Sequence, residues 1–368
     1  MPACTTRRVA TRAATQGSAR NRTGSPTGTL TQDWTPSPVA GAQVALARFG
    51  NLLHLREPAL YSAAVAGISS RANRSAGRVL ILGGSGMLGH KLCQVLSRDL
   101  DVSATFRSPE KALPAFFFGR TRPLFGVDAT ALEQIERALR AERPKVVVNA
   151  IGIVKQRAEA SDPIPSISVN ALFPHRLAAL CATSGARLIH FSTDCVFSGR
   201  TGGYREEDEP DPVDLYGRSK LLGEVGGPGA LTLRTSIIGR EIEHWTGLLE
   251  WFLHAGDRIS GYTRVIWSGV TTNRLSAIVA ELVKAGSPIE GVFHVSSEPL
   301  SKHDLLVALR DAYGLRTEIV PDATPVSDRS LVSDRFWSRT GLNRPSWNDM
   351  LAELVEDSAM YEVLGARR

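Results

Sequence analysis

The feature that most constrains the fold is a glycine-rich segment at residues 83–89, placed between an apolar run and a helical pattern. The run 78–82 is short and apolar, as in a buried strand, and leucines recur at helical spacing from Leu88 onward. A strand, a glycine turn and a helix in this order are typical of a dinucleotide-binding unit. The spacing here is G-x-x-G-x-x-G, a variant of the usual G-x-G-x-x-G.

The glycines of this turn have separate expected roles. Gly83 permits a tight turn, Gly86 lets the backbone approach a pyrophosphate, and Gly89 lets the helix pack closely on the strand. The first turn of the helix would offer its free N–H groups to the phosphates. The predicted cofactor contacts along the turn are Gly83, Ser85, Gly86, Met87, Leu88 and Gly89.

Apolar runs and helical patterns then alternate along the chain. Strands are predicted over 102–106, 145–150, 188–192 and 231–235, with a weaker one ending at Val127-Asp128, and helices around 132–139 and 167–183. This alternation predicts an α/β fold, a Rossmann-type doubly wound parallel sheet. Ligands of such sheets bind at the carboxyl ends of the strands. Further candidate cofactor contacts at those ends are Arg107, Asp128, Ala129, Asn149, Ala150 and Gly152.

The end of the second strand indicates which dinucleotide binds. An acid is expected about 20 residues after the glycine turn when the ribose 2′-hydroxyl is recognised, but Arg107-Ser108 stands there. A cation and a hydroxyl favour the 2′-phosphate of NADP, so NADPH is the predicted cofactor and NADH the less favoured one. Arg107 as a solvated strand end is the alternative. Asp128 is placed to contact an adenine edge, and Gly152 would let the nicotinamide half pass close.

Tyr216 and Lys220 are the candidate proton-transfer residues. They are four residues apart, which places both side chains on one face of a helix, and Asp214 is a plausible N-cap. An ammonium beside a phenol lowers its pKa from about 10, which would make Tyr216 a proton donor and acceptor near neutral pH. Thr193 follows the apolar run 188–191, so its hydroxyl could face the same crevice. A solvated helix face is the alternative for the Tyr-x-x-x-Lys pattern.

The alternation breaks down after Ser236. Helices are predicted over 247–255 and 269–284 and from Ser301, as N-cap, to Tyr313, with a strand over 291–295. We expect domains at 78–236 and 237–368. The second would be a smaller substrate-binding lobe, with some of its segments returning to the first.

Positive charge is concentrated in residues 1–77. The chain has a net charge of +6, but this stretch holds nine arginines and only Asp33 and Glu57 as acids, which leaves −1 for the remainder. We therefore expect no nucleic-acid surface in the globular part. Residues 1–77 are predicted to be a disordered, dispensable basic extension; a transit peptide and an interaction arm are the alternatives.

The other functional classes find little support. The four cysteines and eight histidines lack metal or disulfide spacing, and no apolar run reaches the roughly 18 residues that span a bilayer. We predict a cytoplasmic protein without a metal site or membrane contact. Glu206, Glu207 and Asp208 could bind a metal at a subunit contact, although a solvated acidic loop is favoured.

Several motifs together resemble an extended short-chain dehydrogenase/reductase, and within that group the dTDP-4-dehydrorhamnose reductases. The local pattern is Ser-Thr-Asp-Cys-Val-Phe-Ser-Gly at 192–199, followed by Tyr204, Glu206, Pro210 and the stretch 215–224, with a looser match at 328–331. The resemblance covers about residues 78–350.

The resemblance implies NADPH-dependent reduction of the C4 keto group of a nucleotide-activated 4-keto-6-deoxysugar. Tyr216 would protonate the alkoxide, Lys220 would hold the nicotinamide ribose, and Thr193 would hydrogen-bond the keto oxygen. The partners would be the nucleotide sugar and a second copy in a homodimer. The further predicted substrate contacts are Asp194, Cys195, Arg234, Arg264 and Arg329.

Alternatives stay open at this point. Cys195 stands where 4,6-dehydratases carry a glutamate and where the reductases often carry an aromatic residue, which disfavours dehydration and leaves room for a UDP-linked 4-keto-N-acetylhexosamine. A 4-epimerase is disfavoured by Arg107. A non-catalytic NADP-binding regulatory subunit, as in the β subunit of methionine adenosyltransferase, is the alternative of another class.

Overall fold

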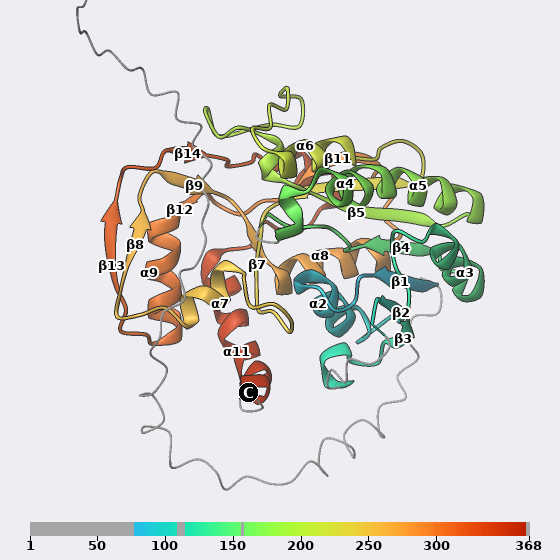
Figure 1. Cartoon of the computed structure of the whole chain (residues 1–368), viewed down its shortest axis with the longest axis horizontal. Helices are drawn as coiled ribbons and strands as arrows, with labels where there is room; N and C mark the ends of the chain where they lie inside the picture. Colours follow the sequence, from blue (N-terminus) through green and yellow to red (C-terminus); the bar gives the residue numbers. More distant parts are fainter. Residues whose placement is uncertain (1–76, 109–114, 156–157, 366–368) are drawn as a thin grey trace, which may run out of the picture. The chain divides into compact units, whose positions relative to one another are not determined.

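A seven-stranded, fully parallel sheet forms the centre of the protein (Figure 1). The computed structural model describes residues 77–108, 115–155 and 158–365. The strand order is β11-β6-β5-β4-β1-β2-β3. Strands are added outward from β1 on one side and from β4 on the other, so the switch point of this doubly wound sheet lies between β1 and β4. The predicted Rossmann-type fold is confirmed. The strands are β1 (Arg78–Leu82), β2 (Asp101–Phe106), β3 (Arg122–Phe125), β4 (Val146–Asn149), β5 (Arg187–Thr193), β6 (Ala230–Thr235) and β11 (Gly291–His294).

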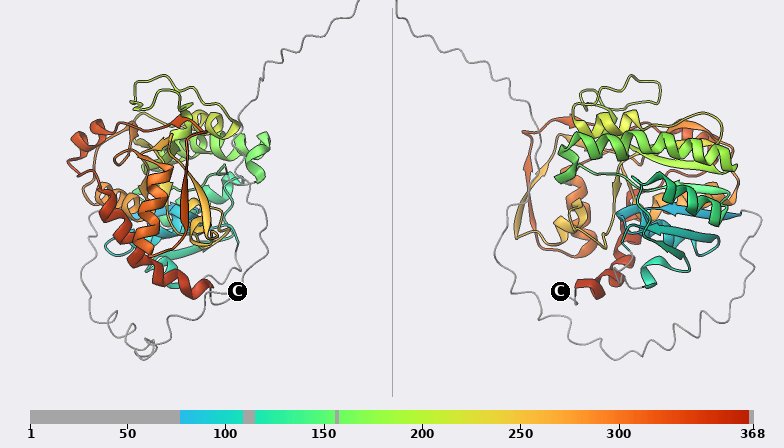
Figure 2. Two further views of the ribbon diagram at one scale, coloured as in Figure 1. Left: turned by 90° about the vertical axis from the view of Figure 1, so that its left-hand side faces the viewer. Right: turned by 45° about the vertical axis from the view of Figure 1, so that its right-hand side comes forward.

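Helices cover both faces of the sheet (Figure 1 and Figure 2). Val79 and Ile81 of β1 pack with α2 (Met87–Leu96) and α8 (Thr272–Lys284), whereas Leu80 and Leu82 pack with α3 (Leu132–Glu142) and α5 (Phe173–Ser184). Successive side chains of a strand point to opposite faces, so a strand buried on both faces is a continuous apolar run. The strong apolar signal of residues 79–82 has this cause.

One predicted strand end is wrong. The third strand was expected to end at Val127-Asp128, but β3 ends at Phe125. Gly126 has a φ of 69°, a left-handed conformation that ends the strand, although the Val127 N–H still donates to the Phe106 carbonyl at 3.1 Å. β3 is an edge strand with mostly exposed side chains, which explains its weak apolar pattern.

The last third of the chain contributes both to the central sheet and to a separate lobe. α8 and β11 belong to the central sheet and its core. A second core, around Leu249, Trp267 and Leu305, holds the lobe at the left of Figure 1. Its elements are α7 (Leu248–Leu253), β8 (Arg258–Tyr262), β9 (Val265–Trp267), β12 (Leu300–Ser301), α9 (Lys302–Tyr313), β13 (Glu318–Asp322) and β14 (Ser327–Asp328). Ser301 caps α9 as predicted, because its Oγ accepts from the Asp304 N–H at 3.0 Å.

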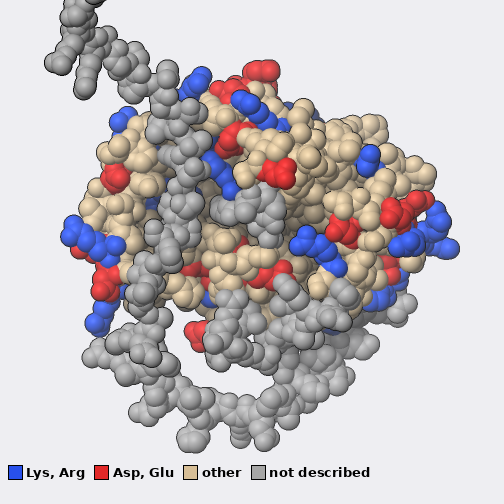
Figure 3. All heavy atoms as spheres, viewed as in Figure 1, with Lys and Arg blue, Asp and Glu red and all other residues tan. Residues whose placement is uncertain are grey.

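Shorter elements connect these parts. They are α4 (Pro163–Ser166), a π-helix (Ile167–Leu172), α6 (Leu215–Leu222), β7 (Ile237–Ile238) paired with β10 (Val270–Thr271), α10 (Asp334–Thr340), α11 (Trp347–Gly365) and 3₁₀ turns at Ala115–Phe118, Ala158–Ser161 and Asp194–Val196. Figure 3 shows basic and acidic side chains interspersed over the described part of one face. None of the helices that the structure describes is long and apolar enough to cross a membrane.

Candidate functional site

The glycine turn has the geometry of a phosphate-binding loop. Gly83 has a φ of 86° and lies so close to Ile151 that a Cβ would be 2.8 Å from Ile151 Cγ1. A Cβ on Gly89 would lie 1.9 Å from the Gly83 carbonyl oxygen, so helix and turn meet with no room for a side chain. Gly86 is the exposed N-cap of α2 and has no side-chain cap, which leaves the N–H groups of the first helical turn free for a phosphate.

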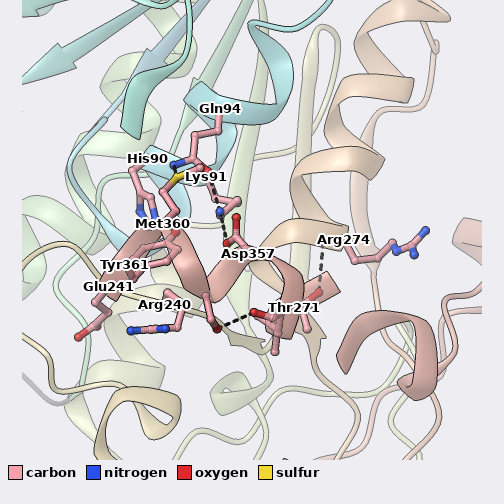
Figure 4. A network of polar contacts seen from close by, with 12 residues as sticks. His90, Lys91, Gln94, Arg240, Glu241, Thr271, Arg274, Asp357, Met360 and Tyr361 are labelled. Atoms are coloured by element: carbon pink, nitrogen blue, oxygen red, sulfur yellow. Dashed lines mark hydrogen bonds and ion pairs between the residues drawn. The ribbon is translucent and has the colours of Figure 1, made fainter. Parts of the chain in front are cut away.

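The helix behind this turn is held by the C-terminal helix (Figure 4). His90 Nδ1 bonds the Gly86 carbonyl oxygen at 2.9 Å, and His90 Nε2 bonds the Tyr361 hydroxyl at 2.6 Å. Lys91 pairs with Asp357 of α11, and its ammonium also donates to Gln94 Oε1 at 2.6 Å. Burial lowers the pKa of His90 to about 3, so the imidazole is neutral. A hydrogen-bonded chain therefore links α11 to Gly86, the N-cap of α2 within the glycine turn.

A pocket joins the glycine turn to the end of β2. It places Ser85 beside Arg107 and Ser108, the pair predicted to hold a 2′-phosphate. Its lining consists of Ser85, Phe106, Arg107, Ser108, Phe118, Gly119, Thr121, Pro123, Phe125 and Glu243. Arg107 is exposed at the rim, so its guanidinium can turn toward a ligand. The pocket has the position and the cation that an adenosine 2′-phosphate needs.

The predicted cofactor contacts at the ends of β3 and β4 form local hydrogen bonds within the protein. Asp128 Oδ1 accepts from the Thr130 N–H at 2.7 Å and from the Thr130 hydroxyl at 2.6 Å, and these bonds lower the pKa of Asp128. Its contact with adenine, and that of neighbouring Ala129, stays a prediction. Asn149 turns inward to bond His190 Nδ1 at 3.1 Å and the Ile151 N–H at 3.1 Å. Asn149 therefore shapes the loop after β4 from below.

The predicted catalytic hydroxyls meet at the end of β5. Asp214 caps α6 as expected, since its Oδ1 accepts from the Gly217 N–H at 2.8 Å. A Cβ on Gly217 would lie 2.2 Å from the Cys195 carbonyl oxygen, so α6 packs directly on the turn that follows Thr193. This close approach brings the Tyr216 hydroxyl near Thr193, whose side chain influences the pKa of the phenol. Thr193 Oγ1 also accepts from the Cys195 N–H at 3.1 Å.

Lys220 points to the backbone of β5. Its ammonium is buried and donates to the Phe191 carbonyl oxygen at 2.6 Å. It lies 4.0 Å from where a Cβ on Gly152 would stand, so it faces the loop that follows Ala150 and β4. Burial lowers the pKa of Lys220 to about 8, against a smaller opposite effect of Glu224. The cation is therefore placed beside the position expected for the nicotinamide half of a cofactor.

The predicted lowering of the Tyr216 pKa is wrong for this arrangement. Burial raises the pKa of Tyr216, the charges of Cys195 and Asp194 raise it further, and only the influence of Thr193 lowers it. The reason is that the Lys220 ammonium bonds Phe191 instead of the phenol. Tyr216 is a neutral phenol at neutral pH, which suits a proton donor.

Arg234 is a further correction. Its Nε and Nη2 each donate to the Glu224 carboxylate at 2.8 Å, and its Nη1 lies 3.3 Å from His294 Nε2. The same carboxylate accepts from the Ser192 hydroxyl at 2.6 Å. This buried, bidentate pair leaves the guanidinium no free edge for a diphosphate, so Arg234 is not a substrate contact in this arrangement.

Of the other predicted substrate contacts, three lie around the turn after Thr193 and one is exposed on another turn. Asp194 is buried and accepts from Thr193 Oγ1 at 3.1 Å, and burial raises the pKa of Cys195 to about 12, which keeps its thiol neutral. Arg329 Nε donates to the Phe197 carbonyl oxygen at 3.0 Å, and its charge acts on Cys195. Arg264 is exposed at the turn between β8 and β9, so its role stays a prediction.

The acidic stretch at 206–208 is only in part a solvated loop. Glu206 accepts from the His294 N–H at 3.0 Å and pairs with Arg335 at 3.4 Å, whereas Glu207 and Asp208 are exposed. In the residues that the structure describes, no group of three potential metal ligands converges. Glu206 is thus a buried connection between two segments, in contrast to the expected solvated side chain.

Sequence reasoning missed two residues of this region. Asn170, in the π-helix, donates to the Ile153 carbonyl and accepts from the Ile153 N–H, both at 2.9 Å, and so holds the loop at Gly152. Lys302, the first residue of α9, lies with its ammonium 3.8 Å from the centroid of the Trp267 ring, and it interacts electrostatically with Asp194. Both placements depend on contacts between distant segments, and a single sequence carries no signal for them.

The fold and the site define the class, an extended short-chain dehydrogenase/reductase-like protein. The sequence model of the RmlD substrate binding domain family matches residues 77–360, and the chain belongs to this family of sugar-nucleotide reductases and epimerases. The resemblance found in the sequence is thereby confirmed.

Curated relatives and solved structures agree with this membership. A probable low-salt glycan biosynthesis reductase of Haloferax volcanii, Agl14, is 31% identical over 230 residues, which cover 59% of this chain and 74% of the relative. The methionine adenosyltransferase 2 subunit beta of Danio rerio is 28% identical over 260 residues, 65% of this chain and 74% of the relative. The dTDP-4-dehydrorhamnose reductase of Bacillus anthracis, crystallised with NADP, superposes with a TM-score of 0.62 at 20% identity and covers 76% of this chain and 99% of that one. A Thermus thermophilus UDP-glucose 4-epimerase complexed with NAD gives 0.61 at 21% identity, covering 76% and 98%.

Proposed function

We propose that this protein is an oxidoreductase that uses NADPH to reduce the C4 keto group of a nucleotide-activated 4-keto-6-deoxysugar, with a dTDP sugar as first choice. One observation carries the proposal. The side chains of Thr193 and Tyr216 lie close enough at the carboxyl end of β5 for Thr193 to influence the phenol, and Lys220 lies beside the loop at Gly152. These are the positions at which ligands of a doubly wound sheet bind.

The residues present fit a nicotinamide dinucleotide. The turn 83–89 would hold the pyrophosphate, Arg107 and Ser108 would hold the 2′-phosphate, and Lys220 would hold the nicotinamide ribose. The bound cofactor would supply the hydride. Arg107 supports NADPH over NADH because a guanidinium can form two charge-assisted bonds to a phosphate.

The hydroxyl pair supports the reduction step. Thr193 and Tyr216 would donate to the keto oxygen, where negative charge develops as the carbonyl is reduced. Tyr216 is a neutral phenol with a raised pKa, so it holds a proton to transfer to that oxygen. Lys220 is still largely charged at neutral pH, since its pKa is about 8, and its field favours the developing anion.

Product analysis tests the proposal. We would incubate the full chain with C4-deuterated NADPH and a dTDP-linked or UDP-linked 4-keto sugar made in situ by a 4,6-dehydratase. Deuterium at C4 of a 6-deoxysugar is the expected result. A folded protein that binds NADPH and consumes none with either sugar contradicts it. The UDP-linked N-acetyl sugar stays the second choice because Cys195 replaces an aromatic residue.

A non-catalytic regulatory subunit is the second candidate. The similarity to the methionine adenosyltransferase 2 subunit beta of Danio rerio favours it. The placement of Tyr216, a neutral phenol, beside Thr193 favours an enzyme, because a partner subunit has no use for a buried proton donor at this position. Co-purification with another enzyme, without NADPH turnover on any keto sugar, would establish the second candidate.

A further inference from the structure

A small sheet in the C-terminal lobe carries two cations to the turn after Thr193. β12 and β14 flank β9, so Ser301 and Asp328 both pair with Ile266. Lys302 follows β12 directly, and Arg329 follows β14. Arg329 Nε donates to the Phe197 carbonyl oxygen at 3.0 Å. The two cations therefore approach the turn 194–197 from the two outer strands of one three-stranded sheet.

Lys302 differs from Arg329 in what it contacts. Its ammonium lies 3.8 Å from the centroid of the Trp267 ring, and that ring is itself buried and packed on Trp347 at 5.6 Å. An ammonium has three hydrogen-bond donors, and a contact with an aromatic face satisfies none of them with an oxygen. Within the described residues, Lys302 makes neither a hydrogen bond nor an ion pair. Three donors on one partly buried cation are left for a ligand.

The surroundings indicate which part of a ligand Lys302 would meet. It interacts electrostatically with Asp194 and Cys195, the two residues that directly follow Thr193. Arg107 lines the pocket beside the glycine turn, and Lys302 does not line that pocket. Lys302 is thus at the end where the keto sugar would react, on the side of the C-terminal lobe.

We propose that Lys302 is a specificity-determining residue that donates hydrogen bonds to oxygens of the substrate's sugar ring. This inference rests on the proposed function, because it assigns the sugar to the same site. The ammonium of Lys302 lies against the face of the Trp267 ring. Its three N–H groups would donate to hydroxyl oxygens on the sugar of the substrate. A sugar with correctly placed hydroxyls satisfies the cation, and one without them leaves it unpaired, which is how such a contact selects.

Binding measurements separate this contact from a structural role. With NADP⁺ present, calorimetry would give the Kd of dTDP-rhamnose and of free dTDP for the wild type, Lys302→Met and Lys302→Arg. We expect Lys302→Met to weaken dTDP-rhamnose about tenfold to a hundredfold, the loss typical of a charged donor, and to leave dTDP within about twofold. Lys302→Arg should recover part of the loss. Lys284→Met is the matched control, since that lysine is on α8 and pairs with Glu281 and Asp99.

The contrary results are distinct. Equal weakening of dTDP-rhamnose and dTDP, or no weakening, overturns the sugar contact, as does a wild type that binds the two ligands equally. A lowered Tm of Lys302→Met together with recovery of sugar affinity in Lys302→Leu would assign Lys302 to packing on Trp267. A wild type that prefers dTDP-rhamnose to dTDP but reduces no keto sugar contradicts the proposed function alone.

Discussion

Lysines on the two sides of the glycine turn differ in whether their charge is paired with a carboxylate. Lys91, behind the turn, is 1% exposed, pairs with Asp357 of α11 and donates to Gln94 (Figure 4). Lys220 and Lys302, at the strand ends, are also desolvated, and burial lowers the pKa of all three. Among the described residues, neither Lys220 nor Lys302 forms an ion pair.

The difference separates scaffold from site. Burying a charge costs free energy unless a partner offsets it, so a fully paired lysine stabilises the fold and can do little else. A lysine that keeps free donors at the carboxyl ends of the strands lowers stability, and binding of an anionic or polar ligand offsets this. We therefore read the α2–α11 network as support for the glycine turn and the Lys220–Lys302 region as the place where ligand is bound.

The sharpest test of the site side of this comparison is Tyr216→Phe. The change removes only the phenolic hydroxyl and keeps the ring, so folding and NADPH binding should persist. Loss of the proton donor should lower kcat about 10²- to 10⁴-fold, measured by NADPH oxidation with the keto sugar. Near-native turnover with an unchanged Tm would contradict the assignment and favour the non-catalytic subunit.

The scaffold side is tested by Lys91→Met. The change leaves Asp357 without its cation, and removal of one partner from a buried pair costs about 3–5 kcal/mol of stability. The free energy of unfolding in urea should fall by an amount near the lower end, because Asp357 is 14% exposed. Lys91→Met combined with Asp357→Leu should recover much of the loss. Lys302→Met, which breaks no ion pair in the described structure, is the matched comparison, and an equal loss there would break the distinction.

The pocket beside β2 is tested by comparing the use of NADPH and NADH. Arg107→Ala should raise the KM for NADPH about tenfold to a hundredfold and leave that for NADH nearly unchanged, because only NADPH carries the 2′-phosphate. Initial rates with each cofactor measure this. Ser108→Ala, which keeps the cation, is the control and should have a smaller effect. Equal use of both cofactors by the wild type would be inconsistent with the 2′-phosphate site.

The sequence predicted those features that depend on neighbouring residues. The glycine turn, the alternating strands and the caps Asp214 and Ser301 are local patterns, and all are present. Pairings between distant segments were not predictable. The sequence gives no sign that Arg234 pairs with Glu224, which accepts from both its Nε and its Nη2. For Lys302 the sequence indicates only a position at the start of a helix.

The Tyr216 pKa shows the same limit in one residue. The spacing of Tyr216 and Lys220 correctly placed both on α6, but it did not show that the ammonium bonds the Phe191 carbonyl. The direction of the pKa change depends on that orientation and on burial. Neither can be read from four residues of spacing.

The smallest expected effect is the pH dependence of kcat/KM, which tests whether the charges of Lys220 and Lys302 are needed. The pKa values of Lys220 and Lys302 are lowered to about 8, so both cations are present below that pH and are lost as the pH rises through it. The titratable groups facing them are Glu224 and the buried His190 for Lys220, and Asp194 and Cys195 for Lys302. The value of kcat/KM should fall about tenfold between pH 8 and 9.

Stability should change in the opposite direction over the same range. Between pH 8 and about 10.4, the ordinary pKa of lysine, the unfolded chain binds more protons at these positions than the folded one, so the free energy of unfolding gains from each lysine as the pH rises. Lys302→Arg keeps its charge throughout, so the fall in kcat/KM that remains belongs to Lys220. A pH profile of Lys302→Arg identical to that of the wild type would remove Lys302 from the titration and leave Lys220 as its sole source. A flat wild-type profile up to pH 10 would show that neither charge is needed, and that these lysines are scaffold in the same sense as Lys91.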